Sequence, residues 1–286
     1  EESDVSKLLR PALIAAALAL AACGQSGQNA GSGKTAAIQA AMPTAVTGSV
    51  SLRTPGALSP NARLHVSLTN VSAKPPVLIG EIKDQPLTQL PASFQLDFNP
   101  ANIDQNAFYV IDATVVDGER HYVAARQYPV LTKGAPAKAD VQLNPEPTAA
   151  EVVEEDYKLL ERAVGGMKRV QGSSEDENST TAWDGFFDKK GLRYIREITD
   201  LGDKGRVNTY FGYREDGKVL MVVKENVPAM AERANAVVRA GWNEKGELVL
   251  KTKRDGATVG TLSDADAKAL HDRAASMFDM VSKRKP

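Results

Sequence analysis

"ARLHVSLTNVS" (residues 62–72) alternates apolar and polar side chains through its centre. Neighbouring side chains of an extended chain point to opposite faces, so Leu64, Val66 and Leu68 share one face. The polar residues between them share the other face. This period of two predicts a β-strand with one face in a hydrophobic core and the other in water.

Further short strands are predicted on both sides of this stretch, separated by turns rich in proline. Alternating or apolar runs occur at 50–52, 94–98, 107–116, 120–126, 127–131 and 139–143. Asp117-Gly118 joins two of these runs and favours a hairpin turn. About seven strands at this spacing predict a β-sandwich or a barrel-like relative of it.

Charged residues divide the chain into two parts. Residues 23–145 carry 17 charged side chains, whereas all later residues together carry 49. Between the two parts, Asn144-Pro145-Glu146-Pro147-Thr148 is typical of a stiff, turn-forming connection. We therefore predict a β-domain at residues 46–145, a linker at 146–150 and a second domain at 151–286.

Five sequence blocks of the first domain are typical of a known family. They are "GSVSLRT" (48–54), "ARLHVSLTNVS" (62–72), "PPVLIGEI" (75–82), "LPASFQLDFNP" (90–100) and "RQYPVLTKG" (126–134). In this order they resemble the YbaY-type lipoproteins, whose domain is related to the YscW-type pilotins of type III secretion. The resemblance covers about residues 46–145 and implies an outer-membrane lipoprotein with an immunoglobulin-like or related β-fold. Such pilotins bind a secretin subunit and carry it to the outer membrane, so an envelope protein is the implied partner.

The N-terminus has the organisation of a bacterial secretion signal. The twelve uncharged residues from Pro11 to Ala22 follow a basic segment and are too few to span a bilayer. The sequence "LAAC" at residues 20–23 resembles the lipobox of bacterial lipoproteins, which implies cleavage between Ala22 and Cys23. We therefore predict a signal peptide at residues 1–22.

Cys23, the single cysteine of the chain, is the predicted site of lipid attachment. The lipobox resemblance implies diacylglycerol on its sulfur and a fatty acyl chain such as palmitate on its new amino group. Several acyl chains on one residue anchor a protein stably. Gly24 at the next position favours the outer membrane of a Gram-negative bacterium, with the protein facing the periplasm. Because acidic residues precede Lys7, we expect translation to start naturally at Val5.

Residues 23–45 are rich in Gly, Ser, Gln and Ala and are predicted to form a flexible tether. Within them, "GSGKT" at residues 31–35 is similar to the end of a phosphate-binding loop. That pattern requires glycine where this chain has Gln28. We therefore predict no nucleotide binding.

Charge and composition argue against two further classes of function. The formal net charge of -1 provides no basic field for nucleic acid. One cysteine and three scattered histidines, His65, His121 and His271, form no metal-ligand pattern. We expect no metal and no cofactor other than the covalent lipid on Cys23.

Two amphipathic helices are predicted at the ends of the second domain. In residues 151–164, apolar residues recur at helical spacing and share one face, and Gly165-Gly166 then ends the helix. Ser263 is a suitable N-cap for the second helix, whose apolar residues recur as far as Val281. The basic residues 283–285 suit the C-terminal end of a helix dipole or an anionic lipid headgroup.

Three related segments lie between these helices. They are "FDKKGLRY" (187–194), "YREDGKVL" (213–220) and "WNEKGELV" (242–249). Each places an aromatic residue, polar residues and glycine before alternating apolar residues, which is typical of a β-hairpin. They predict an antiparallel meander of about six strands with one dry face. We expect residues 171–181 to form a mobile loop and residues 227–238 to form a helix or a crossover.

These patterns predict a mainly β protein, with an N-terminal β-sandwich and a C-terminal α+β domain of meander and packing helices. We expect a non-enzymatic binding, scaffolding or pilotin-like module for envelope proteins. Phe187, Tyr213 and Trp242 are its candidate partner contacts, because aromatic residues dominate interface energetics. Alternatively, they face the dry side of the sheet as part of the core.

Two other functions stay open. A hydrolase of the cell envelope needs a nucleophile with a base or two opposed carboxylates, for which Glu197 with Asp200 or Asp184 with Asp188 are the candidate pairs. An inhibitor or sensor of a cell-wall-active enzyme would instead insert the segment 171–181. Converging acids in a pocket would favour the enzyme, whereas an exposed aromatic residue or strand edge would favour the binding module.

Overall fold

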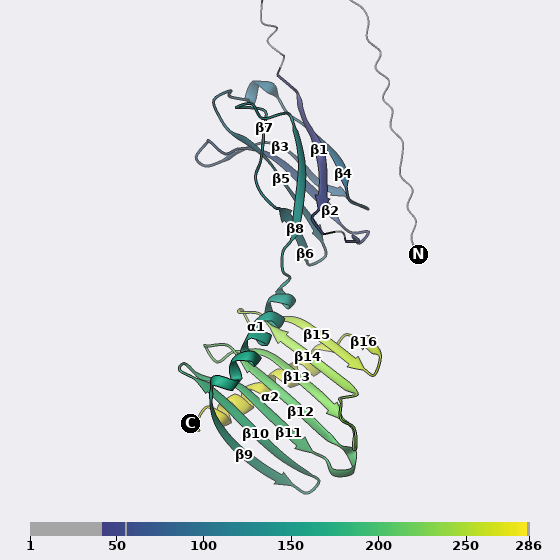
Figure 1. Cartoon of the computed structure of the whole chain (residues 1–286), viewed down its shortest axis with the longest axis vertical. Helices are drawn as coiled ribbons and strands as arrows, with labels where there is room; N and C mark the ends of the chain where they lie inside the picture. The colour runs from purple at the N-terminus through teal and green to yellow at the C-terminus, as the bar shows by residue number, and fades with distance from the viewer. Residues whose placement is uncertain (1–41, 55, 285–286) are drawn as a thin grey trace, which may run out of the picture. The chain divides into compact units, whose positions relative to one another are not determined.

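The computed structural model describes residues 42–54 and 56–284, which form two β-sheets and two α-helices (Figure 1). The predicted mainly β class is confirmed. The predicted signal peptide, the lipid site Cys23 and most of the tether lie outside the described residues. In the described ranges, every helix is too short or too polar to cross a membrane.

The first sheet follows from the alternating segments of the sequence. Its strands are β1 (Ala45–Leu52), β2 (Arg63–Asn70), β3 (Val77–Pro86), β4 (Ala92–Asp97), β5 (Tyr109–Asp117), β6 (Arg120–Ala124), β7 (Tyr128–Val130) and β8 (Lys138–Pro145). Their order is β3-β2-β5-β6-β8-β1-β4, and β7 pairs with β5. The pairing of β1 with β8 is parallel, whereas the other pairings are antiparallel. A short 3-10 helix, η1 (Pro100–Asn102), follows β4.

The first sheet curls until its outer strands, β3 and β4, approach one another. A Cβ atom at Gly80 of β3 would lie 2.9 Å from Cδ2 of Leu96 and 3.2 Å from the carbonyl oxygen of Asp97, both in β4. Only glycine fits at this distance without displacing a neighbour. The strands therefore form one nearly closed sheet around a single core.

The core of the first sheet contains the apolar side chains of the alternating pattern. Leu64, Val66 and Leu68 are each 0% exposed, as the period of two predicted. His65 lies on the outer face, where its Nε2 is 3.9 Å from a carboxylate oxygen of Glu81. Burial of apolar side chains at every second position is the main force that closes the sheet.

The second sheet is an antiparallel meander in which each strand pairs with its neighbours in sequence. Its strands are β9 (Lys168–Asp176), β10 (Ser179–Asp188), β11 (Gly191–Asp200), β12 (Arg206–Tyr213), β13 (Val219–Val227), β14 (Ala236–Trp242), β15 (Leu248–Asp255) and β16 (Thr258–Gly260). The short helices η2 (Val164–Gly166) and η3 (Gly202–Lys204) precede β9 and β12. The three predicted hairpins are β10–β11, β12–β13 and β14–β15. Gly217 and Gly246 adopt positive φ angles of 82° and 83° in the turns of the last two.

Two expectations for the second sheet are wrong. Residues 171–181 are not a mobile loop, because they run through β9 and β10, which pair along their whole length. Residues 227–238 form neither a helix nor a crossover. Val227 ends β13 and Ala236 begins β14, and these antiparallel neighbours need only a connecting loop. The meander therefore has eight strands, more than expected.

Helices α1 (Ala149–Ala163) and α2 (Asp264–Val281) cover opposite faces of the second sheet, as Figure 1 shows. Tyr157 of α1 packs on Gly212 of β12, where a Cβ atom would lie 2.9 Å from the tyrosine ring. The next residue, Tyr213, points to the other face and donates a hydrogen bond of 2.8 Å to the carbonyl oxygen of Ala274 in α2. The second sheet thus has a hydrophobic cluster on each face, so the expectation of a single dry face is wrong.

Both helices begin at side chains that satisfy their first N–H groups. The Thr148 hydroxyl accepts a hydrogen bond of 3.2 Å from the N–H of Glu151, whose carboxylate accepts one of 2.9 Å from the N–H of Thr148. This reciprocal capping box starts α1. Ser263 caps α2, as predicted, by accepting a hydrogen bond of 3.1 Å from the N–H of Asp266. Residues 146–148 connect β8 with α1.

Candidate functional site

The three aromatic residues expected to contact a partner lie inside the second sheet's core. Phe187, Tyr213 and Trp242 are 8%, 0% and 5% exposed and belong to the cluster beneath α2. Each stands before a hairpin turn at an inward-facing position of its strand. The expectation that these side chains are presented to a partner is therefore wrong, and the alternative that they face the dry side of the sheet is confirmed.

The carboxylates proposed as acid pairs do not face one another. Glu197 and Asp200 are three positions apart on β11, so their side chains leave opposite faces of the sheet. Asp184 and Asp188 share a face of β10, but each accepts a hydrogen bond from an arginine of β11, at 2.5 and 2.6 Å. These carboxylates form ion pairs, and neither pair provides the two opposed acids that hydrolysis requires.

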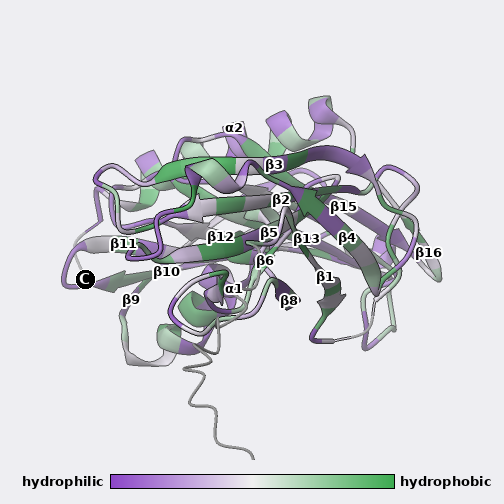
Figure 2. Cartoon of the chain, turned by 90° about the horizontal axis from the view of Figure 1, so that it is seen from above, coloured by the Kyte–Doolittle hydropathy of each residue, from purple (hydrophilic) through white to green (hydrophobic). Residues whose placement is uncertain are grey.

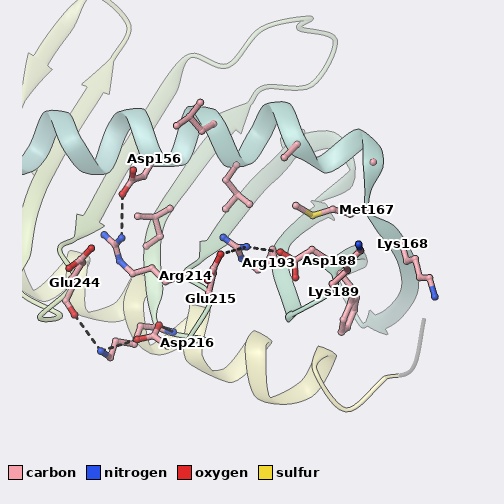
Figure 3. Close-up of a pocket in the computed structure, with 17 residues that line it drawn as sticks. Asp156, Met167, Lys168, Asp188, Lys189, Arg193, Arg214, Glu215, Asp216 and Glu244 are labelled. Atoms are coloured by element: carbon pink, nitrogen blue, oxygen red, sulfur yellow. Dashed lines mark hydrogen bonds and ion pairs between the residues drawn. The ribbon is translucent and has the colours of Figure 1, made fainter.

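A groove of about 1380 Å³ lies between the C-terminal half of α1 and the hairpin turns of the second sheet (Figure 3). Ion pairs hold its two arginines. Arg193 binds Asp188 at 2.6 Å and Arg214 binds Asp156 at 3.3 Å. Figure 3 shows Lys168 at one end of the groove, beyond these pairs.

The carboxylate of Asp188 is stabilised in its charged form. Partial burial raises its pKa, but hydrogen bonds from the backbone N–H groups of Lys190 and Gly191 and from Arg193 lower it. Burial is the largest single contribution, but the lowering contributions together outweigh it, so the pKa lies below the usual value. Asp188 is therefore an anionic structural partner of Arg193 near neutral pH.

Arg214 is largely buried in the groove. Its side chain is 15% exposed, and it donates a hydrogen bond of 3.0 Å to the carbonyl oxygen of Trp242. Its Nε is buried and has no hydrogen-bond partner in the described part of the chain. The described residues that line the groove include no Ser, Thr, Cys or His. Paired charges of this kind can orient a polar ligand.

A second surface is an apolar patch on the first sheet, which we call the β3 patch. It consists of Val71, Val77, Leu78 and Phe108, whose exposed fractions are 38%, 47%, 51% and 53%. Exposed apolar groups that lie together are typical of binding surfaces, whereas single ones are ordinary.

Backbone hydrogen bonds bring the members of the β3 patch together. The N–H of Val71 donates to the carbonyl oxygen of Phe108 at 3.0 Å, and the N–H of Phe108 donates to Oγ of Ser72 at 2.9 Å. In the adjoining ladder, Val77 pairs with Asn70 of β2. The start of β3, the turn before it and Phe108, which precedes β5, are therefore neighbours in the sheet, with Val77 and Leu78 on opposite faces of the strand.

The β3 patch also includes the edge of a strand at Val77 and Leu78, before the approach of β4 at Gly80. β3 is the outer strand of its sheet and is hydrogen-bonded to β2 on one side. Figure 2 colours it green at its hydrophobic start and purple towards its charged end. An outer strand beside exposed apolar side chains can bind an extended peptide by adding it to the sheet.

The described residues contain no group of three His, Cys, Asp or Glu side chains that could hold a metal ion. His121 is exposed on β6. His271 packs edge-on against Trp242, with 4.9 Å between the ring centroids. Its place between the core and the surface of α2 is that of a packing residue.

Sequence patterns did not identify the β3 patch. Val77, Leu78 and Ile79 form a continuous apolar run, which is typical of a buried strand. The run belongs to an outer strand instead, and its first two residues are exposed. The position of a strand in its sheet is a tertiary property, so no local pattern reports it.

The chain is similar to bacterial lipoproteins of the envelope. The family model described as "Type III secretion system lipoprotein chaperone (YscW)" matches residues 41–143. The lipoprotein YbaY of Escherichia coli strain K12 is 32% identical over 152 residues, which are 46% of this chain and 75% of YbaY.

Among solved structures, the chain is similar to an alternative pilotin from the type II secretion system of Vibrio cholerae. The identity is 28%, and the match covers 36% of this chain and 96% of the pilotin with a TM-score of 0.33.

Proposed function

We propose that this chain, which belongs to the YbaY family of lipoproteins, is a non-enzymatic, pilotin-like binding module for another protein of the bacterial envelope. The match of residues 41–143 to a family of lipoprotein chaperones carries this proposal. A chaperone acts by holding another protein, and all four members of the β3 patch lie within the matched residues. The patch is therefore the surface on which we place the partner.

We further propose that the lipid on Cys23 anchors the chain to the outer membrane, with both sheets in the periplasm. The sequence "LAAC" at residues 20–23 and the lipoprotein relative support the anchor, and Gly24 supports the outer membrane. A flexible tether from Cys23 to the start of β1 at Ala45 would have a root-mean-square span of roughly 25 Å. The first sheet would then reach a partner close to the membrane surface.

The expected partner is an extended segment of an outer-membrane protein with apolar side chains at every second position. Its backbone would add to the edge of β3 at Val77 and Leu78, before the approach of β4 at Gly80, and residues of the segment beyond the added strand would cover Phe108. Main-chain hydrogen bonds supply affinity in such complexes, and alternate side chains supply specificity. A segment of this kind is hazardous before assembly because it can aggregate, which gives a chaperone its purpose.

The test is affinity capture after cross-linking in membranes that carry the wild-type chain or the double variant Leu78→Asp/Phe108→Asp. We expect recovery of an outer-membrane partner to fall about tenfold or more in the variant, because each new carboxylate would be desolvated in an apolar contact. Val259→Asp is the matched control, since Val259 is 75% exposed on β16 and lies outside the patch.

Equal recovery with the wild type and the double variant would reject the β3 patch as the binding surface. Absence of any partner for the wild type would reject the binding role itself. Cys23→Ala examines the anchor separately. We expect the Cys23→Ala chain to be absent from the outer-membrane fraction. Its retention in that fraction would reject the lipid anchor.

A further inference from the structure

The outer edge of β9 has no strand paired to it in residues 42–54 and 56–284. The nine residues of this strand, Lys168–Asp176, pair with β10 on their other side. Seven of the nine are exposed and none is buried. An edge of this length presents a row of backbone N–H and C=O groups to any strand that approaches.

β9 carries opposite charges at its two ends. Lys168 and Arg169 begin the strand, Glu175 and Asp176 end it, and the five residues between them are uncharged. An antiparallel neighbour with the same sequence would place its acidic end against the basic end of β9 and its basic end against the acidic end. A parallel neighbour would place like charges together, which is unfavourable.

We propose that β9 pairs in the antiparallel direction with β9 of a second copy of this chain, so that the two second sheets join across a two-fold axis. The register that matches every charge places Lys168 opposite Asp176 and Arg169 opposite Glu175. Residues opposite one another in a ladder point to the same face of the sheet. In each of these two pairs the residue numbers differ by an even number, so both side chains lie on the same face of the strand, as the pairing requires. Symmetry repeats each pair, so the contact contains four ion pairs.

Gly172 lies on the two-fold axis in this register and faces its own copy. A residue in that position meets its own side chain at close range, and glycine has none. On one face the indole of Trp183 already covers this position, because a Cβ atom at Gly172 would lie 2.3 Å from Cζ2 of Trp183. Gly172 therefore adds no side chain at the two-fold axis.

The end of α2 adds positive charge to the basic half of the edge. Val281, the last residue of α2, and Val170 of β9 both border Gly185, at 2.4 and 3.3 Å from the position of a Cβ atom there. Lys283 and Arg284 follow Val281 and are exposed. The proposed register brings the acidic half of the second copy's β9 to this side, so the additional charges are complementary to it.

The opposite edge of the same sheet is protected. β16 has three residues, Thr258–Gly260, and none of them is charged. Very short edge strands are a common means of preventing association. Of the two edges, β9 has both the length for a ladder and the charges that select an antiparallel copy.

The experiment measures the mass of the full chain by native mass spectrometry after release from detergent micelles. We expect the wild type to be a dimer that dissociates on dilution. The variants K168E/R169E and E175K/D176K each give the edge one sign of charge along its length. Each is expected to be monomeric where the wild type is dimeric, with a dissociation constant raised roughly tenfold or more.

An equimolar mixture of the two variants tests the register. The all-acidic edge of one is complementary to the all-basic edge of the other, so the mixture is expected to form a heterodimer although neither variant forms a homodimer. K253E/R254E on β15 is the matched control. It changes the net charge as much as K168E/R169E does and is expected to remain dimeric.

A wild-type chain that is monomeric at every concentration overturns the proposal. Dimers that persist in both variants overturn it too, because the contact would then lie elsewhere. The proposal is also overturned if the mixture forms no heterodimer although both variants melt at the same temperature as the wild type. If a charge reversal unfolds the chain, K168Q/R169Q takes its place and must weaken the dimer for the proposal to stand.

Discussion

The carboxylate of Glu197 on β11 accepts a hydrogen bond from Arg273 on α2, with 2.5 Å between Oε2 and Nη2. The Glu197 side chain is 7% exposed, whereas that of Arg273 is 51% exposed. A buried carboxylate depends on its charged partner, because removal of the partner leaves an uncompensated charge out of water. This ion pair therefore links α2 to the sheet that it covers.

Arg273→Ala is expected to lower the free energy of unfolding by about 1–3 kcal/mol, since Glu197 loses its charged donor. Chemical denaturation followed by tryptophan fluorescence measures this, because Trp183 and Trp242, the two tryptophans of the chain, both lie in the cluster beneath α2. Arg162→Ala removes the exposed pair with Glu155 and should change the free energy by less than about 0.5 kcal/mol. Equal losses in the two variants would contradict a special role for the Glu197 pair.

Gly172→Ala should destabilise the second sheet, because the new methyl group would overlap the Trp183 indole at 2.3 Å. Overpacking of this kind costs about 1–3 kcal/mol, and the displaced indole should shift the tryptophan emission. Gly165→Ala is the control, since a Cβ atom there meets nothing within 4 Å. A Gly172→Ala chain with unchanged stability and emission would show that the indole moves aside without cost.

Asp188→Asn is expected to be less stable than the wild type at neutral pH and equally stable in strong acid. The folded chain lowers the pKa of Asp188 below 3.8, so the charged form stabilises the fold above that pH. The stabilisation decreases as the pH falls below about 4 and is lost once the pH passes below the folded-state pKa. Urea titrations between pH 7 and pH 2 measure the difference. Asp279→Asn, at an exposed position of α2, serves as the control, and a difference that does not depend on pH would contradict the assignment.

Thr148→Ala should lower the free energy of unfolding by about 1 kcal/mol, because it removes the hydroxyl that accepts a hydrogen bond from the N–H of Glu151 at the start of α1. Thr148→Ser keeps the hydroxyl and should restore most of the loss. Denaturation of the three chains under the same conditions checks this. Comparable stability of the alanine and serine variants would show that the cap contributes little.

Local patterns predicted the elements because each depends on a repeat that a short segment contains. The period of two at Leu64, Val66 and Leu68 predicted β2, and the helical spacing from Val153 to Leu160 predicted α1, since side chains on one face must be buried together. The same reasoning failed for residues 171–181. Their polar composition is typical of a loop, but β10 supplies hydrogen-bond partners along their length and makes them a strand.

The sequence by itself determined most of the strands and both helices, because period and turn chemistry are local. Five sequence blocks also determined which family the first part of the chain resembles. Only the tertiary structure decided which apolar residues reach solvent. Trp242 is buried because α2 covers its face of the sheet, whereas Leu78 is exposed because β3 is an outer strand. Exposure depends on the position of a strand among its neighbours and on the helix that covers it, and neither is encoded within the strand's own residues.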